Sequence, residues 1–171
     1  MKTVKIILGI ITALTLVFFA TGLFVKETTY TVKTSMKKPL QKVFRTFNSK
    51  TKVKKWEPTV QSVDEIVLKK GVVGSVYEVT TRTENDTVIL TEKVIAYIPN
   101  KKITYRSVSE NFLKIDDYSF QKKGDSTTIL KKVVYESNSY LMQCVFPYLK
   151  KSFIEADQKK LDNFSAYIKT Q

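Results

Sequence analysis

Residues 74–106 read GSVYEVTTRTENDTVILTEKVIAYIPNKKITYR, and this stretch decides the class of fold. Apolar and polar residues alternate along most of it, which is typical of strands that bury one face of a sheet. Turn formers interrupt the alternation at 84–86 and at Pro99-Asn100. Because such short connections join antiparallel neighbours, we predict three consecutive antiparallel strands here. Their predicted bounds are 73–84, 87–98 and 101–109.

The same alternation continues on both sides of this stretch. Three further strands are predicted, with breaks at turn formers such as Gly124-Asp125. Their predicted bounds are 60–69, 112–123 and 126–137. A seventh strand is predicted ahead of them, because Tyr30, Val32 and Met36 alternate with polar residues.

Helical periodicity occurs before and after the run of six strands. Pro39 opens a helix whose apolar stripe reaches Phe47, and a short second helix follows before Trp56. A long helix is predicted over 139–169, and Pro147 is expected to kink it or to mark its true start. The apolar stripe of this helix is predicted to run through Leu141, Val145, Tyr148, Leu149, Phe153, Ala156, Leu161, Phe164 and Ile168.

The order of elements is therefore strand, two short helices, six strands and one long helix. This order predicts an α+β fold in which a curved, seven-stranded antiparallel sheet wraps around the C-terminal helix. A curved sheet that grips a helix commonly leaves a cavity between the two.

The N-terminal segment is a candidate membrane span. Residues 6–25 read IILGIITALTLVFFATGLFV, an uncharged run long enough to cross the roughly 30 Å hydrocarbon core as a helix. The alternative is a cleaved signal peptide, because small residues at 20–22 suit a cleavage site. We favour a retained anchor over residues 1–26, since the apolar run continues to Val25, and we predict one domain over 27–171.

The orientation of the anchor follows from its flanking charges. Lys2 and Lys5 favour a cytoplasmic N-terminus, which places the domain outside the cytoplasm on a single-pass anchor. Four lysines on the other side argue weakly against this layout: Lys26, Lys33, Lys37 and Lys38. We predict a cell-membrane protein with an extracytoplasmic domain.

Composition excludes several classes of function. The chain has no histidine and one cysteine, so histidine-based catalysis, intrachain disulfides and cysteine-rich zinc sites are excluded. It also lacks the glycine motifs of dinucleotide and P-loop sites, and we expect no catalytic residue, metal or cofactor. The net charge is +13, of which residues 27–171 carry +10. This charge suits either a solvated face or an anionic bilayer surface, and no nucleic-acid-binding motif accompanies it.

Four segments together resemble the START-like superfamily, also called the polyketide cyclase/dehydrase and lipid-transport, SRPBCC or helix-grip group. They are PLQKVFRTFNSKTKVKKWEPTV (39–60), GSVYEV (74–79), LTEKVIAYIPNKKITYR (90–106) and FIEADQKKLDNFSAYIK (153–169). The resemblance covers nearly all of residues 27–171 and lies in the order and spacing of the motifs. It implies the helix-grip fold, without a catalytic set common to the family. The N-terminal anchor is an addition to the common pattern.

We predict ligand-binding residues on the faces that point into the cavity. They are Trp56, Tyr77, Val79, Leu90, Tyr105, Tyr118, Phe120, Val145, Tyr148 and Leu149. The favoured function is non-catalytic binding of a hydrophobic or lipid-like small molecule by a membrane-anchored domain. The alternatives are a cyclase or dehydratase acting on such a molecule and a protein-interaction module whose cavity is filled. The protein partner of such a module stays unspecified.

The predicted strand 87–98 can turn either of its two faces inward, and the two alternatives place Glu92 differently. Glu92 faces inward if Leu90 and Val94 do, and it is exposed if Ile89 and Ile95 face inward. We favour the exposed alternative.

The other reactive side chains are expected to have no catalytic role. Asp116 and Asp117 are adjacent in a strand, so they point to opposite faces and are expected to be solvated. Cys144 is expected to be a buried thiol that no imidazole activates. The lysine pairs, including the one at 131–132, are dispersed and predict a generally basic surface.

Overall fold

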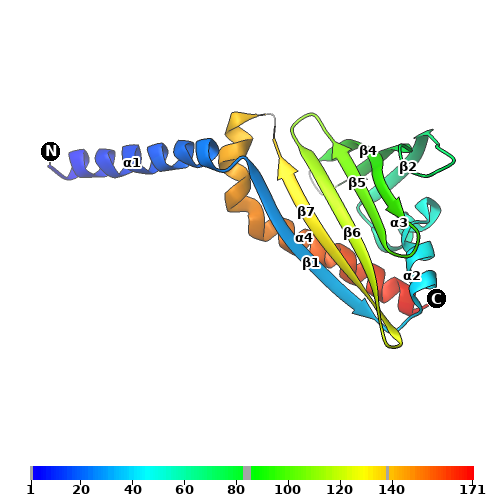
Figure 1. Cartoon of the computed structure of the whole chain (residues 1–171). Coiled ribbons are helices and arrows are strands. Elements are labelled where there is room, and N and C mark those ends of the chain that lie inside the picture. The colour runs from blue at the N-terminus through cyan, green and yellow to red at the C-terminus, as the bar shows by residue number, and fades with distance from the viewer. Residues whose placement is uncertain (1, 83–85, 138) are drawn as a thin grey trace.

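The computed structural model describes residues 2–82, 86–137 and 139–171. The turn predicted at 84–86 therefore lies, except for Asp86, outside the described residues. One antiparallel sheet and one long helix make up most of the chain, and a separate N-terminal helix projects from them (Figure 1).

The sheet has seven strands in the order β1-β7-β6-β5-β4-β3-β2, and every neighbouring pair is antiparallel. Strands β2 to β7 form a meander, and the first strand of the chain pairs with the last. The strands are β1 (Glu27–Met36), β2 (Val60–Val67), β3 (Val76–Arg82), β4 (Thr87–Ile98), β5 (Lys102–Val108), β6 (Leu113–Lys123) and β7 (Ser126–Glu136). The predicted strands are confirmed, with differences of up to three residues at their ends, and so are the predicted turns that lie within the described residues.

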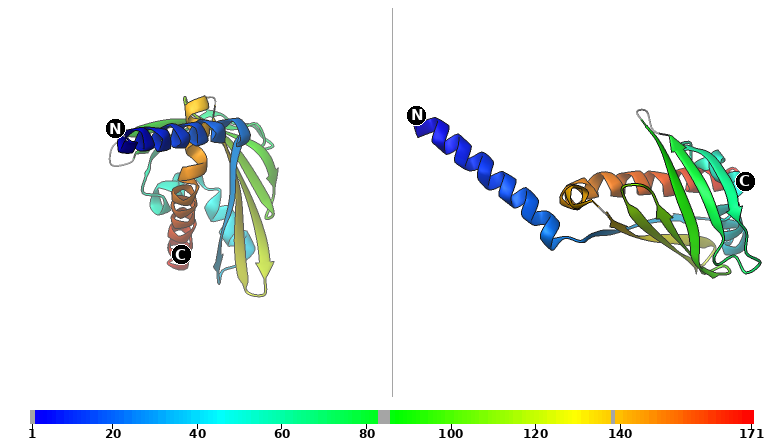
Figure 2. Two further views of the ribbon diagram at one scale, coloured as in Figure 1. Left: turned by 90° about the vertical axis from the view of Figure 1, so that its left-hand side faces the viewer. Right: turned by 90° about the horizontal axis from the view of Figure 1, so that it is seen from above.

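The helices occur in the predicted order along the chain. They are α1 (Lys2–Phe24), α2 (Leu40–Phe47), the short 3-10 helix η1 (Lys50–Lys52), α3 (Val53–Trp56) and α4 (Tyr140–Lys169). The last turns of α4 lie beside α2 and α3, as Figures 1 and 2 show. The predicted α+β helix-grip architecture is confirmed.

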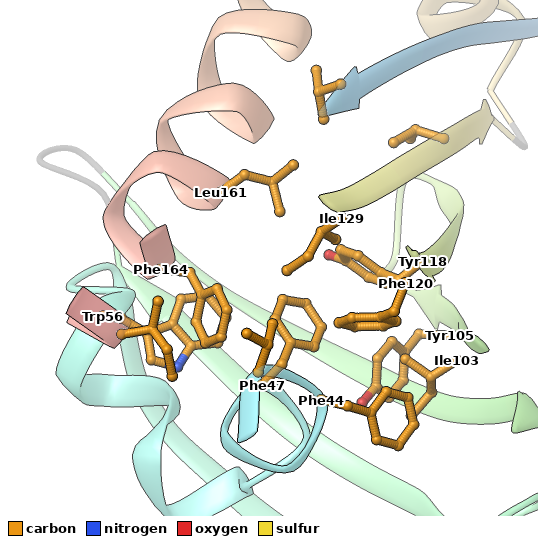
Figure 3. Packing of buried hydrophobic residues seen from close by; sticks show 14 of the residues in the cluster. Phe44, Phe47, Trp56, Ile103, Tyr105, Tyr118, Phe120, Ile129, Leu161 and Phe164 are labelled. Atoms are coloured by element: carbon orange, nitrogen blue, oxygen red, sulfur yellow. The ribbon is translucent and has the colours of Figure 1, made fainter. Parts of the chain in front are cut away.

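Aromatic rings fill most of the space between the sheet and α4. The ring of Phe47 lies within 5.0 Å of the ring of Phe164 and within 5.5 Å of that of Trp56, measured between centroids (Figure 3). Tyr118 and Phe120 of β6 contact the ring of Phe47 from the sheet. The core therefore joins α2, α3, α4 and the concave face of the sheet.

The predicted apolar stripe of α4 is correct only for the second half of the helix. Leu161, Phe164 and Ile168 are buried against the sheet, as predicted. Leu141, Tyr148 and Leu149, by contrast, are 53%, 59% and 40% exposed, and that part of the prediction is wrong. The first turns of α4 bend away from the sheet and lie against α1 instead (Figure 1).

Pro147 lies within α4, and the sequence predicts a kink there. Proline has no N–H to donate and its ring crowds the preceding turn, which kinks a helix. Helix α4 nevertheless begins at Tyr140, so Pro147 does not mark its start.

Helix α1 is the one helix in the described part of the chain that is long and apolar enough to cross a membrane. Only its last turns touch the rest of the protein, through α4. A Cβ atom added to Gly22 would lie 2.5 Å from the Sγ atom of Cys144, so the two helices meet closely there. Cys144 is fully buried, as predicted.

Candidate functional site

A small cavity lies between the sheet, α3 and α4. Its volume is about 60 Å³. Its apolar wall is formed by Phe47, Val53, Trp56, Val60, Val63 and Val79, with Tyr105 and Tyr118, and its polar wall by Lys50, Glu92, Asp116 and Lys160. Drug-sized ligand pockets usually measure roughly 300–1,000 Å³, so side chains must move apart before a larger ligand can enter.

Four of the ten predicted ligand-binding residues line this cavity. They are Trp56, Val79, Tyr105 and Tyr118. Tyr77, Leu90 and Phe120 belong to the surrounding core without lining the cavity. Val145, Tyr148 and Leu149 lie in the first turns of α4, away from the cavity and near α1.

Trp56 contributes an unusual polar group to the cavity wall. The side chain is only 4% exposed and stacks on Phe47. Its indole N–H is buried and has no hydrogen-bond acceptor within the described part of the chain. Buried donors almost always have a partner, and an ordered water or a ligand oxygen would satisfy this one.

An ion pair forms part of the polar wall of the cavity. The ammonium group of Lys50 donates to the Oε1 atom of Glu92 at 2.6 Å. The same ammonium lies 4.3 Å from the ring centroid of Tyr77 and 4.2 Å from that of Tyr105, which stabilises it further. The predicted exposure of Glu92 is wrong, because its side chain is 19% exposed and faces the cavity.

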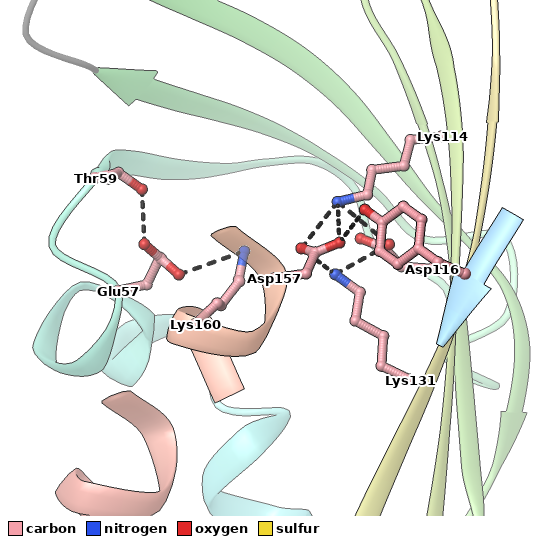
Figure 4. Close-up of polar contacts among 8 residues, drawn as sticks. Glu57, Thr59, Lys114, Asp116, Lys131, Asp157 and Lys160 are labelled. Atoms are coloured by element: carbon pink, nitrogen blue, oxygen red, sulfur yellow. Dashed lines mark hydrogen bonds and ion pairs between the residues drawn. The ribbon is translucent and has the colours of Figure 1, made fainter. Parts of the chain in front are cut away.

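A second charged group lies deeper, where α4 crosses β6 and β7 (Figure 4). We call it the buried ion cluster: Lys114, Asp116, Lys131 and Asp157. The carboxylate of Asp157 accepts from Lys131 at 2.6 Å and from Lys114 at 3.1 Å. Asp116 lies 3.1 Å from the ammonium of Lys131 and 3.4 Å from that of Lys114. Two cations and two anions therefore balance each other inside the protein.

A tyrosine adds a further hydrogen bond to the cluster. The hydroxyl of Tyr30 in β1 donates to Asp157 Oδ2 at 2.6 Å. Burial alone would raise the pKa of Asp157, but Lys131 and Lys114 together with these hydrogen bonds hold it below its ordinary value. Burial likewise opposes the charged form of both lysines, and the two carboxylates outweigh it and raise the lysine pKa values. Asp157 and the two lysines are therefore stabilised in their charged forms at neutral pH.

Two predictions about charged residues are corrected by this cluster. Asp116 and Asp117 do point to opposite faces, since Asp117 bonds Thr104 and Lys102 away from the cluster. Asp116, however, is buried and paired, so its predicted solvation is wrong. Lys131 is 0% exposed and does not belong to the basic surface.

The sequence held a signal for these positions. Lys131 alternates with Ile129 and Val133 on the inward face of a strand, and Asp157 lies four residues from Leu161 on the apolar stripe of α4. Opposite charges on two faces that are predicted to meet indicate a buried pair. The sequence interpretation treated the lysine pairs as one surface class and missed this signal.

A further polar contact joins the end of α3 to α4. Glu57 is buried, accepts a hydrogen bond from Thr59 at 2.7 Å and lies 3.7 Å from the ammonium of Lys160 (Figure 4). Lys160 lines the cavity. This contact holds the segment that carries Trp56 against α4.

Comparison with known proteins places the fold. No protein-family profile matches the sequence, and no curated protein matches it. Solved structures do match. A protein of Thermus thermophilus has a TM-score of 0.71 at 12% identity, over 84% of this chain and 98% of that one. The Zhui aromatase/cyclase of a Streptomyces species has a TM-score of 0.68 at 8% identity, over 84% and 94%.

A plant protein shares the same architecture. The ginseng major latex-like protein 151 of Panax ginseng has a TM-score of 0.66 at 17% identity, over 83% of this chain and 97% of that one. The chain thus has the START-like helix-grip fold, which is the fold that the sequence resemblance implied. Likeness at these identities defines the fold, while function must be argued from the site itself.

Proposed function

We propose that the protein is a membrane-anchored, non-catalytic binder of a hydrophobic or lipid-like molecule. In this proposal residues 1–26 are the anchor, and residues 27–171 bind the ligand in the cavity between the sheet and α4. The aromatic and aliphatic wall of the cavity suits an apolar group, and its few polar atoms suit one polar end.

The observation that carries the proposal is that Trp56, which lines the cavity, has a buried N–H with no acceptor among the residues that the structure describes. A buried donor without an acceptor costs about 1–3 kcal/mol, so an acceptor from a ligand would recover this energy on binding. Carboxyl, carbonyl and hydroxyl oxygens are suitable acceptors. The proposed ligand is therefore amphipathic, with an oxygen atom beside its apolar body.

The sole tryptophan of the chain makes the proposal directly testable. Full-length protein in lipid nanodiscs is titrated with oleic acid while the fluorescence of Trp56 is followed. We expect a saturable shift of the emission, because binding changes the surroundings of the indole ring. Ligand that merely dissolves in the bilayer leaves this buried ring unaffected.

A matched pair of variants locates the response. Val79→Phe places a ring in the cavity and should abolish the fluorescence shift, whereas Ile89→Phe, on an exposed position of the next strand, should retain it. An emission that stays constant with fatty acids, phospholipids and sterols would overturn the proposal. The protein-interaction module with a filled cavity would then account for the small volume.

A second candidate function is favoured by one observation. Glu92 and Asp116 come from different strands and both line the cavity, as the two carboxylates of an acid–base catalyst would. Both are already in ion pairs with lysines, which is why binding without chemical change is the leading proposal. Turnover of a bound molecule that is lost in Glu92→Gln would instead establish a cyclase- or dehydratase-like enzyme.

The proposed location is the cell membrane, with the domain outside the cytoplasm. The packing of Gly22 against Cys144 supports a retained anchor, because cleavage near residue 22 would uncover a buried thiol. Lys2 and Lys5 support the orientation. Protease added to spheroplasts should digest the domain, and protection until the membrane is broken would reverse the orientation.

A further inference from the structure

The exposed apolar face of α4 begins at the end of the membrane-spanning candidate. The hydroxyl of Tyr140 donates to the backbone carbonyl of Phe19 at 2.5 Å, and the hydroxyls of Tyr148 and Thr21 lie 2.9 Å apart. The rings of Phe19 and Tyr140 are stacked, with 6.3 Å between their centroids. The first turns of α4 are thus fixed to the last turns of α1 by side-chain and backbone contacts.

These contacts set the depth of α4 relative to a bilayer that α1 crosses. A helix rises roughly 1.5 Å per residue, so Phe19 lies roughly 9 Å and Thr21 roughly 6 Å inward from the end of the apolar run at Val25. Interfacial helices bury their apolar faces about 5–10 Å into the boundary between headgroups and acyl chains. Side chains that bond Phe19 and Thr21 therefore lie at the depth of that boundary.

The direction of these turns fits the same boundary. The first turns of α4 run across α1 in Figure 1, and Figure 2 shows them end on from above, where α1 lies across the picture. When α1 follows the bilayer normal, they lie along the surface. The helix then leaves this direction and continues over the sheet.

The side chains on these turns have the chemistry of an interfacial helix. Leu141, Tyr148 and Leu149 are exposed and lie at helical spacing on one face. Tyrosines are enriched at both bilayer interfaces, where the ring is apolar and the hydroxyl is polar. Lys150 and Lys151 follow immediately, are exposed, and can reach anionic headgroups with their long side chains.

We propose that residues 140–151 form a second membrane contact, an interfacial helical segment that lies in the surface of the bilayer crossed by α1. Leu141, Tyr148 and Leu149 enter the acyl boundary, and Lys150 and Lys151 bind anionic phospholipid headgroups. The inference rests on the proposed membrane anchor. It adds that the domain is held in one orientation relative to the bilayer. Helix α4, which lines the cavity, then begins in the bilayer surface.

The test uses spin labels on the full-length chain in nanodiscs of equal parts phosphatidylcholine and phosphatidylglycerol. Cys144→Ser removes the one native thiol, and Leu149→Cys or Leu141→Cys carries the label. Ile89→Cys is the matched control, because Ile89 is an exposed apolar residue on the sheet, outside these turns of α4. Leu14→Cys, on the exposed middle of α1, reports the anchor itself.

The expected result is a ratio of oxygen to nickel-chelate accessibility that is several-fold higher at Leu149 and Leu141 than at Ile89. Equal, aqueous accessibility at Leu149, Leu141 and Ile89, with lipid accessibility at Leu14, would overturn the interfacial segment and leave the anchor standing. Protection from both relaxing agents at Leu149 and Leu141 would overturn it in favour of a protein contact. Aqueous accessibility at Leu14 would overturn the anchor and the segment together.

Discussion

Lys131 on β7 and Asp157 on α4 form an ion pair of 2.6 Å in the interior, and the lysine side chain is completely buried. The pair connects the middle of α4 to β7, the strand next to β1 in the sheet. Such a pair contributes less than its attraction suggests, because both charges lose their hydration. Removing one partner is costly, since the other charge then remains buried without full compensation.

Asp157→Asn is expected to lower the free energy of unfolding by about 3–5 kcal/mol. The substitution keeps the size of the side chain but leaves Lys131 and Lys114 with only Asp116 as a counter-charge. Chemical denaturation of the full-length protein in micelles, followed by circular dichroism, measures the loss. The control is Asp162→Asn on the exposed side of the same helix, where we expect a change within about 0.5 kcal/mol. Equal losses in both variants would contradict the role of the cluster.

The pH dependence of stability follows from the same cluster. The pKa of Asp157 is lower in the folded chain, because Lys131 and Lys114 together outweigh burial. Its contribution to stability is complete above the pKa of an unfolded aspartate, about 4, and is lost as the pH falls further. Thermal melts between about pH 2 and pH 7 should therefore show a fall in Tm below about pH 4 that is shallower in Asp157→Asn. Parallel curves for the two proteins would contradict this assignment.

Lys114 and Lys131 predict a second loss of stability, at alkaline pH. Their pKa values are raised in the folded chain by the two carboxylates, against the effect of burial. Their contribution is complete below the pKa of an unfolded lysine, about 10.4, and is lost as the pH rises through the folded value. Lys131→Met should remove part of the alkaline fall in Tm above about pH 10. A variant that loses stability at alkaline pH as steeply as the wild type would show that Lys131 does not contribute to this limb.

Gly22→Val should separate α1 from α4. The added side chain would meet the Sγ atom of Cys144. A Cβ atom added to Gly9 would meet no other part of the described chain within 4 Å, so Gly9→Val is the matched control. Labelling with a maleimide reports the separation without background, because Cys144 is the sole cysteine. We expect several-fold faster labelling in Gly22→Val and the wild-type rate in Gly9→Val. Unchanged labelling of both variants would mean that α1 does not cover the thiol.

The strands were predictable because burial of one face imposes a period of two on the sequence. The phase of β4 was not, because a β-bulge between Val94 and Ala96 exchanges the faces partway along the strand. Leu90 and Val94 face inward before the bulge, while Tyr97 packs on Phe44 after it. The favoured phase, in which Ile89 and Ile95 face inward, placed Glu92 on the wrong side of the strand.

The first half of α4 shows a second limit of sequence patterns. The stripe through Leu141, Tyr148 and Leu149 is real, but a periodic stripe does not state which surface covers it. We predicted that this stripe packs on the sheet, whereas it lies beside α1 and is exposed. Three predicted ligand residues lie in this half of the helix, and three others belong to the core without lining the cavity, so four of the ten line it.

Native mass spectrometry of the full-length protein, released from detergent micelles, tests ligand binding most directly. The account predicts a discrete adduct of one small hydrophobic molecule on the wild type and on Ile89→Phe, and its loss in Val79→Phe. Lipids that adhere to α1 would appear equally in all three proteins. An apo mass alone in the wild type, or one adduct unchanged in all three, would contradict binding in the cavity beside Trp56.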